Sequence, residues 1–150
     1  FQQKRDIPGF KKSREDDLAN MQTGIFGFKG HIAYRLADPV NTWIDTLADL
    51  PKGQFFTAVA ERMDRAIHAG YTLYPGNYAA LDLLHGTHDY ADRYTADDLA
   101  RFEKYLAERL ALIDLPEKDE PFLRQCMLTM YANPVKNHEK AVAEVVTKGR

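Results

Sequence analysis

The sequence predicts a mainly α-helical chain that carries one β-strand near its beginning and about five helices after it. Residues 31–37 alternate between apolar and polar side chains and end at an Asp-Pro pair, which is typical of a strand. From residue 54 onward, apolar residues recur at the spacing of one helix face. Because a lone strand is not stable in water, we expect the rest of its sheet to lie upstream of the chain. The predicted division is a remnant of an α/β core over residues 1–50 and a helical C-terminal region over residues 51–150.

Two local signals organise the chain before the strand. Ser13 and Asp16 form a capping box, which predicts a short helix over residues 14–22. Glycines interrupt the next stretch and predict a loop or turns at Gly24, Gly27 and Gly30. The first residue is Phe and the opening segment is polar, so we expect the chain to be part of a longer protein.

Three helices are predicted in the first part of the helical region. The first starts near residue 54 and stops at Gly70, and the second covers residues 78–84 and stops at Gly86. The third follows a second capping box and ends before Pro116. The residues that carry these predictions are the apolar stripe Phe55, Phe56, Val59, Met63 and Ile67, the box Thr95–Asp98, and the stripe Leu99, Phe102, Leu106, Leu110 and Ile113.

Two further helices are predicted at the end of the chain. Asp119, Glu120 and Pro121 mark the start of the first, because proline is tolerated in the first turn of a helix. Asn133 followed by Pro134 is again a cap-plus-proline signal. We therefore expect a break at this pair and a last helix over residues 135–146.

Composition limits the classes of function. A formal net charge of −2 lacks the basic excess of nucleic-acid-binding proteins, so no nucleic-acid partner is expected. The apolar runs are only a few residues long, far short of the roughly 18 residues of a membrane span. The single cysteine, Cys126, cannot form an intrachain disulfide and suits a reducing compartment, so we expect a cytoplasmic location.

The densest polar cluster contains His85, His88 and Asp89. Two histidines three residues apart can share a helix face and bind a metal ion, but Gly86 separates them at a predicted helix end. The alternative is structural, with His85 or His88 capping the last carbonyl groups of the preceding helix. Cys126 lies on an apolar helix face, where a thiol is usually an inert small hydrophobe rather than a nucleophile.

Other candidates also have a structural interpretation. The paired carboxylates Asp16–Asp17 and Asp97–Asp98 fall in first helical turns, where the helix dipole favours them. The glycines at 24–30 match no phosphate-binding fingerprint and precede the strand, which favours a turn, although Lys29 and Arg35 could contact an anion. The tyrosines at 71–78 could face lipid or pack between helices.

Two segments resemble the later part of bacterial phospholipid/glycerol acyltransferases, the superfamily that includes 1-acyl-glycerol-3-phosphate acyltransferases. They are EDDLANMQTGIFGFKGHIAYRLADPVN at residues 15–41 and MDRAIHAGYTLYPGNYAALDLLHG at residues 63–86. In that family the last core strand reads as glycine, a basic residue, alternating apolar residues and a Gly-Pro or Asp-Pro turn. Residues 30–39 resemble this pattern, and residues 74–78 resemble the Tyr-Pro-x-Asn-Tyr element that follows. The resemblance covers about residues 10–90 and extends more loosely to Met130–Pro134.

The resemblance implies transfer of an acyl group from an acyl-thioester, carried by CoA or an acyl carrier protein, to a hydroxyl of glycerol phosphate or a lysophospholipid. The family's catalytic motif is a histidine, any four residues and an aspartate, with a Glu-Gly-Thr-Arg-like motif further on. None of the five histidines has aspartate at the fifth position after it, and no Glu-Gly-Thr-Arg string occurs. We therefore assign no catalytic, cofactor-binding or metal-binding residue and expect both motifs upstream of residue 1.

On this interpretation the chain itself is accessory. Its helical region would cover the core, shape access of acyl donor or acceptor, or mediate self-association, and contact with the inner membrane would be peripheral. Two alternatives remain. One is a free-standing helical protein–protein interaction module without catalytic activity, and the other is a metal enzyme built on His85, His88 and Asp89.

Overall fold

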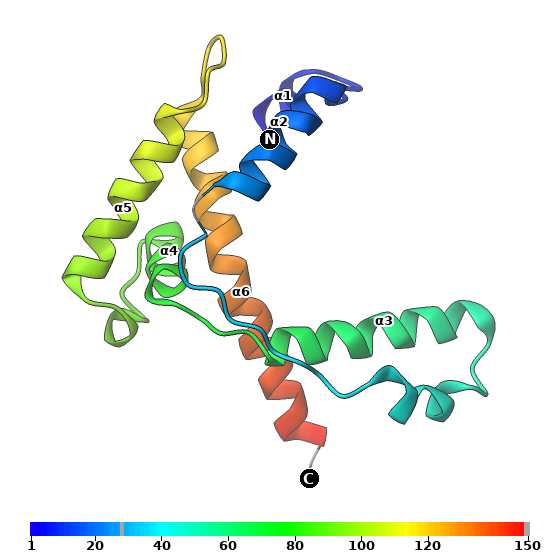
Figure 1. The fold of residues 1–150 in the computed structure, drawn as a ribbon. Coiled ribbons are helices and arrows are strands. Elements are labelled where there is room, and N and C mark those ends of the chain that lie inside the picture. Colours follow the sequence, from blue (N-terminus) through cyan, green and yellow to red (C-terminus); the bar gives the residue numbers. More distant parts are fainter. Residues whose placement is uncertain (28, 149–150) are drawn as a thin grey trace.

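The computed structural model describes residues 1–27 and 29–148, and over this part of the chain it contains six α-helices, three short 3₁₀-helices and no strand (Figure 1). The mainly helical prediction is confirmed. The elements are α1 (Gln2–Asp6), α2 (Arg14–Phe26), η1 (Val40–Thr42), η2 (Ile44–Leu47), α3 (Lys52–Ala69), α4 (Pro75–His85), η3 (Ala91–Arg93), α5 (Ala96–Ala111) and α6 (Glu120–Lys148).

The hydrophobic core lies where α4, α5 and α6 pack together. Small side chains on α4 and α6 are fully buried there, which lets the two helices approach closely. The apolar stripe predicted on α5 supplies the third wall. The buried residues of this core are Ala79, Ala80, Leu81, Phe102, Leu106, Leu128, Ala132 and Val135. Residues 75–135 therefore contain a continuous packed core of their own.

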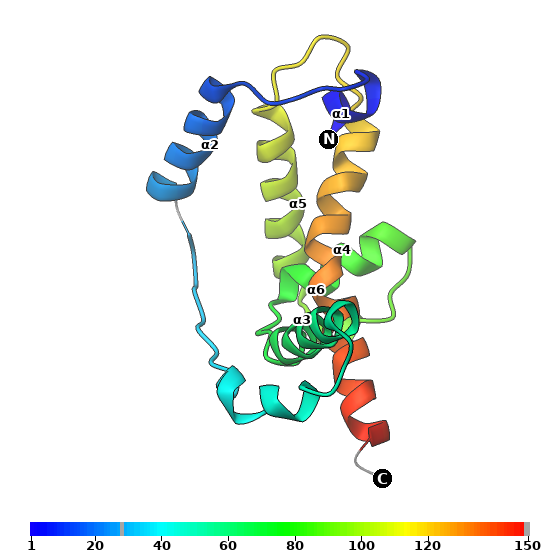
Figure 2. The ribbon, with the colours of Figure 1, turned by 90° about the vertical axis from the view of Figure 1, so that its right-hand side faces the viewer.

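Helix α3 extends away from this core (Figures 1 and 2). None of its residues is buried, although its sequence is amphipathic. It is joined to α6 near its C-terminal end, where His138 Nδ1 lies 2.9 Å from the His68 carbonyl oxygen. The face that carries Phe56, Met63 and Ile67 is exposed.

The two predicted capping boxes are confirmed. The Ser13 hydroxyl accepts from the Asp16 amide, and the Thr95 hydroxyl accepts from the Asp98 amide, at 3.0 and 3.1 Å. Gly86 ends α4 in the left-handed region at φ 66°, a conformation that glycine adopts without a steric penalty. These ends were predictable because each depends on residues adjacent in sequence.

The capping box of α5 predicts an acid-sensitive helix start. Hydrogen bonds from Thr95, together with Arg101, lower the pKa of Asp98 to about 2. Since the folded pKa lies below the unfolded value, this contribution to stability is present above about pH 4 and is lost as the pH falls toward 2. Urea unfolding across this window should therefore show a smaller loss of stability in Asp98→Asn than in the parent chain. Asp97→Asn is the matched control, and an equal change in both variants would contradict the assignment.

The strand predicted at residues 31–37 is wrong. This segment is extended and runs beside residues 70–74, with Arg35 Nε 3.4 Å from Thr72 Oγ1 and the rings of His31 and Tyr74 5.4 Å apart. Its contacts are made by side chains, and no ladder of backbone hydrogen bonds joins the two segments in the part of the chain that the structure describes. A strand requires that ladder, and the alternating side chains alone do not supply it.

The prediction for the segment before it is partly wrong. The helix expected over residues 14–22 continues to Phe26, so Gly24 lies inside α2 instead of in a turn. One glycine destabilises a helix by only about 1 kcal/mol relative to alanine. Helix α2 therefore continues through Gly24 and ends at Phe26, with Gly27 as its C-cap. Residue 28, which belongs to the same predicted turn region, lies outside the described residues.

The break predicted at Asn133–Pro134 is also wrong, because α6 is one helix with Pro134 inside it. An interior proline removes one backbone hydrogen bond and costs about 3 kcal/mol. Two tertiary contacts offset this cost. Ala132 and Val135 on either side of the proline are fully buried in the core, and Asn77 Nδ2 donates to the Tyr131 carbonyl at 2.9 Å. The two predicted last helices are thus held as one.

Candidate functional site

The predicted histidine cluster does not assemble into a site. His85 lies in the last turn of α4, and the side chains of His85, His88 and Asp89 are exposed. Over the residues that the structure describes, no group of three histidine, cysteine or acidic side chains is placed to hold a metal ion. The end of α4 is capped by backbone groups instead, because the amides of Gly86 and Thr87 both donate to the Asp82 carbonyl.

Asp82 is the charged residue that the sequence reasoning missed. Only 2% of it is exposed, and its carboxylate accepts from the Thr87 hydroxyl at 3.0 Å, the Tyr90 amide at 3.1 Å and the Tyr94 hydroxyl at 2.8 Å. Burial and this hydrogen bond raise the pKa of Tyr94. The signal in the sequence was a single acid within the apolar run 79–84, followed by hydroxyl-bearing residues. Asp82 organises the loop after α4 and faces no cleft, so its role is structural.

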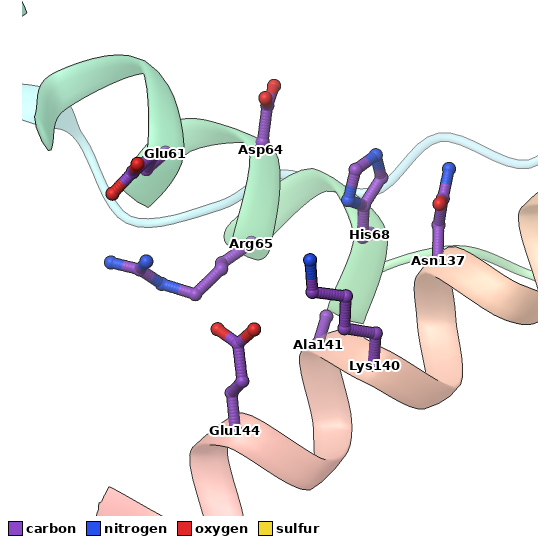
Figure 3. A pocket seen from close by; sticks show the side chains of 8 residues that line it. All are labelled: Glu61, Asp64, Arg65, His68, Asn137, Lys140, Ala141 and Glu144. Atoms are coloured by element: carbon purple, nitrogen blue, oxygen red, sulfur yellow. The ribbon is translucent and has the colours of Figure 1, made fainter. Parts of the chain in front are cut away.

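A polar cleft of about 330 Å³ lies between α3 and the C-terminal half of α6 (Figure 3). Figure 3 shows Lys140 and Glu144 on α6 pointing toward α3, from which Arg65 reaches into the space between the two helices. Side chains of both charges line it: Glu61, Asp64, Arg65, His68, Asn137, Lys140, Ala141 and Glu144.

The chemistry available in this cleft is limited. It contains an imidazole that could act as a base but no hydroxyl or thiol that could act as a nucleophile. Its carboxylates outnumber its cationic side chains, so it offers no excess positive charge for a phosphate group. The arrangement fits a charged contact between two helices, and it carries no catalytic constellation.

Cys126 lines a second groove, of about 430 Å³, along α6 beside the N-terminus. The other lining residues are apolar or carry neutral polar groups: Phe1, Phe122, Gln125, Thr129, Met130 and Asn133. No basic side chain lines this groove, so none is placed to remove the proton from the Cys126 thiol. The interpretation of Cys126 as a small hydrophobe therefore fits its surroundings.

The remaining candidates make contacts within the chain. Lys29 Nζ lies 3.5 Å from the Thr23 carbonyl, and Arg35 contacts Thr72. The tyrosines at 71–78 pack between segments: Tyr71 lies against His68, and Tyr78 lies 5.6 Å from the ring of Tyr90. Gly24 is helical and makes no turn that could cradle a phosphate.

Exposed apolar side chains also gather on α2 and on the extended segment after it. Helix α2 buries none of its residues, and its apolar side chains recur at helical spacing on one side. In the extended segment every second side chain is apolar, and Leu36 is fully exposed. We call this the N-terminal apolar surface: Leu18, Met21, Ile25, Ile32, Tyr34 and Leu36.

Comparison with known proteins adds no family. No family model, no curated protein and no solved structure matches the chain. Across residues 1–27 and 29–148, none of the helices combines the length and the apolar character needed to cross a membrane.

Proposed function

We propose that the chain is the C-terminal part of a glycerolipid acyltransferase and that the N-terminal apolar surface is where it meets the α/β core of that enzyme. The observation that carries the proposal is a contrast within the chain. The helices from α4 to α6 enclose a packed core, whereas α2 buries nothing and the segment after it has all its side chains exposed. Exposed apolar side chains gathered on neighbouring segments of a chain commonly mark a surface that meets a partner.

The chemistry of the extended segment supports a sheet as that partner. Ile32, Tyr34 and Leu36 alternate with His31, Ala33 and Arg35, as the side chains of a strand do. No backbone hydrogen bond is formed by the segment among the described residues, so its amide and carbonyl groups are available to a neighbouring strand. A helix followed by an extended segment, as in α2 and residues 31–37, is also the order in which elements follow one another in an α/β layer.

In the proposed enzyme the reaction takes place on the upstream core. A histidine there removes the proton from the acceptor hydroxyl, and an aspartate orients the histidine. The new ester C–O bond forms as the thioester C–S bond breaks, and the thiol leaves with the proton. Acyl-CoA or acyl carrier protein would be the donor, and glycerol phosphate or a lysophospholipid the acceptor. The residues of this chain position the core and shape its surroundings, and none of them takes part in the chemistry.

A helical protein–protein interaction module is the second candidate. The observation that favours it is helix α3, which buries no residue and exposes Phe56, Met63 and Ile67 on one side. Such a face can bind a partner helix or groove. This candidate uses α3 as the binding element, whereas the acyltransferase proposal uses α2 and the extended segment.

The first test is the coding sequence that precedes residue 1. A His-x4-Asp motif followed by a Glu-Gly-Thr-Arg-like string is expected there, and a start codon immediately before Phe1 would refute the proposal. In the longer protein, Ile32→Asp with Leu36→Asp should abolish acyl transfer from acyl-CoA to lysophosphatidic acid, because two charges would be buried against the sheet. Phe56→Asp, on the exposed face of α3, is the control and should keep its activity. A longer protein without acyl-transfer activity, or a double variant as active as the parent, would contradict the proposal, and absence of the activity would favour the second candidate.

A further inference from the structure

Residue Gln2 makes an unusual contact for a side chain so close to the N-terminus. It is 7% exposed, and both ends of its amide are bonded to the turn between α5 and α6. Its Nε2 donates to the Glu117 carbonyl at 3.0 Å, and its Oε1 accepts from the Asp119 amide at 2.9 Å. Glu117 itself has a positive φ of 52°, so this contact holds a turn that a non-glycine residue adopts only at a cost.

Arg5 strengthens the same contact one turn later in α1. Its Nη1 donates to Asp119 Oδ2 at 2.7 Å, and its guanidinium lies 4.0 Å from the centre of the Phe122 ring. The other oxygen of Asp119 accepts from the Phe122 amide and so caps the start of α6. Helix α1 is therefore tied to the first turn of the longest helix in the bundle.

Contacts hold the chain on both sides of α2. One is the contact of Gln2 and Arg5 with residues 117–122, and the other is the contact of residues 31–35 with residues 70–74. Between these two places α2 stands apart from the bundle (Figure 2), and none of its side chains is buried. We name residues 7–27 the strap.

We infer that Gln2 and Arg5 form a latch that fixes the N-terminal end of the strap on the helical bundle. Release of these contacts is then the step that allows α2 to move. The latch thereby sets the position in which Leu18, Met21 and Ile25 are presented. The inference does not depend on the acyltransferase proposal, since it concerns contacts within residues 1–148 alone.

Two measurements on the 150-residue chain test the latch. The first is amide hydrogen exchange of Asp119, whose amide donates to Gln2 Oε1. The second is the distance distribution between spin labels at exposed positions of α2 and α5, introduced as Gln22→Cys and Ala107→Cys with Cys126→Ser. The latch variant is Gln2→Ala with Arg5→Ala, and Lys4→Ala, also on α1, is the matched control.

In the latch variant the Asp119 amide should exchange roughly tenfold faster or more, and the label distance should broaden, while the amides of Leu106 and Ala132 keep their protection. The control should behave as the parent chain. An unchanged distance distribution would overturn the inference, because the strap would then be held elsewhere. A broad distribution in the parent chain would overturn it too, as would equal acceleration of the Leu106 and Ala132 amides, which would mean that the whole bundle had been destabilised.

Discussion

Leu106→Ala is expected to lower the free energy of unfolding of the chain by about 2–5 kcal/mol. Leu106 is 1% exposed and projects from α5 into the core shared with α4 and α6. The substitution removes apolar contacts and leaves a cavity that rigid helices can fill only in part. Since small domains are stable by roughly 5–15 kcal/mol in total, the expected loss is a large share of the stability.

Urea denaturation followed by circular dichroism measures this loss. Leu112→Ala is the control, because Leu112 is 72% exposed just after the same helix and should change stability by less than about 0.5 kcal/mol. Similar small effects in both variants would contradict the packing described here. They would show that the bundle of α4, α5 and α6 is not the part of the chain that carries its stability.

The helix ends of this chain were predictable because their causes are local. Thr95 and Asp98 bond each other across one turn, and Gly86 needs only its own lack of a side chain to adopt a positive φ. The stripe on α5 is equally local. Its central residues Phe102, Leu106 and Leu110 are buried, and its two end residues are half-buried. Each of these features is decided within about four residues, which is the range over which sequence patterns are informative.

The errors arose where distant residues decide the outcome. Pro134 was expected to end a helix, but Asn77 and the packing of Val135 keep α6 continuous across it. The alternation at residues 31–37 was expected to give a strand, but a strand depends on a partner that the pattern itself does not contain. The local pattern was identified correctly in both cases, and a contact distant in sequence determined the result.

The site predictions show the same division. His85 and His88 were considered as metal ligands because imidazole binds metal ions well. In the structure both side chains are exposed, and no metal-binding group of three forms among the described residues. Asp82 was not predicted to be important, because most aspartates lie on the protein surface. Burial is a property of the tertiary fold, so the sequence could show the acid within an apolar run but not the three donor groups that close around it.

Asp82→Ala is expected to destabilise the chain by roughly 2–5 kcal/mol, since it leaves the Thr87 hydroxyl, the Tyr90 amide and the Tyr94 hydroxyl without their acceptor. Asp82→Asn keeps one acceptor oxygen and should lose less. Asp92→Ala, at an exposed position in the same loop, is the control for loss of charge alone.

A local measurement separates this network from a general loss of stability. Burial and the hydrogen bond to Asp82 raise the pKa of Tyr94 in the parent chain, so its stabilising contribution is present below the ordinary tyrosine pKa and declines as the pH rises through the elevated one. In folded Asp82→Asn the charge of the acceptor is gone, and the Tyr94 pKa, followed by phenolate absorbance, should fall toward its ordinary value. If it stayed raised, burial alone would account for the shift. The hydrogen bond from the Tyr94 hydroxyl to the Asp82 carboxylate would then contribute nothing to the Tyr94 pKa.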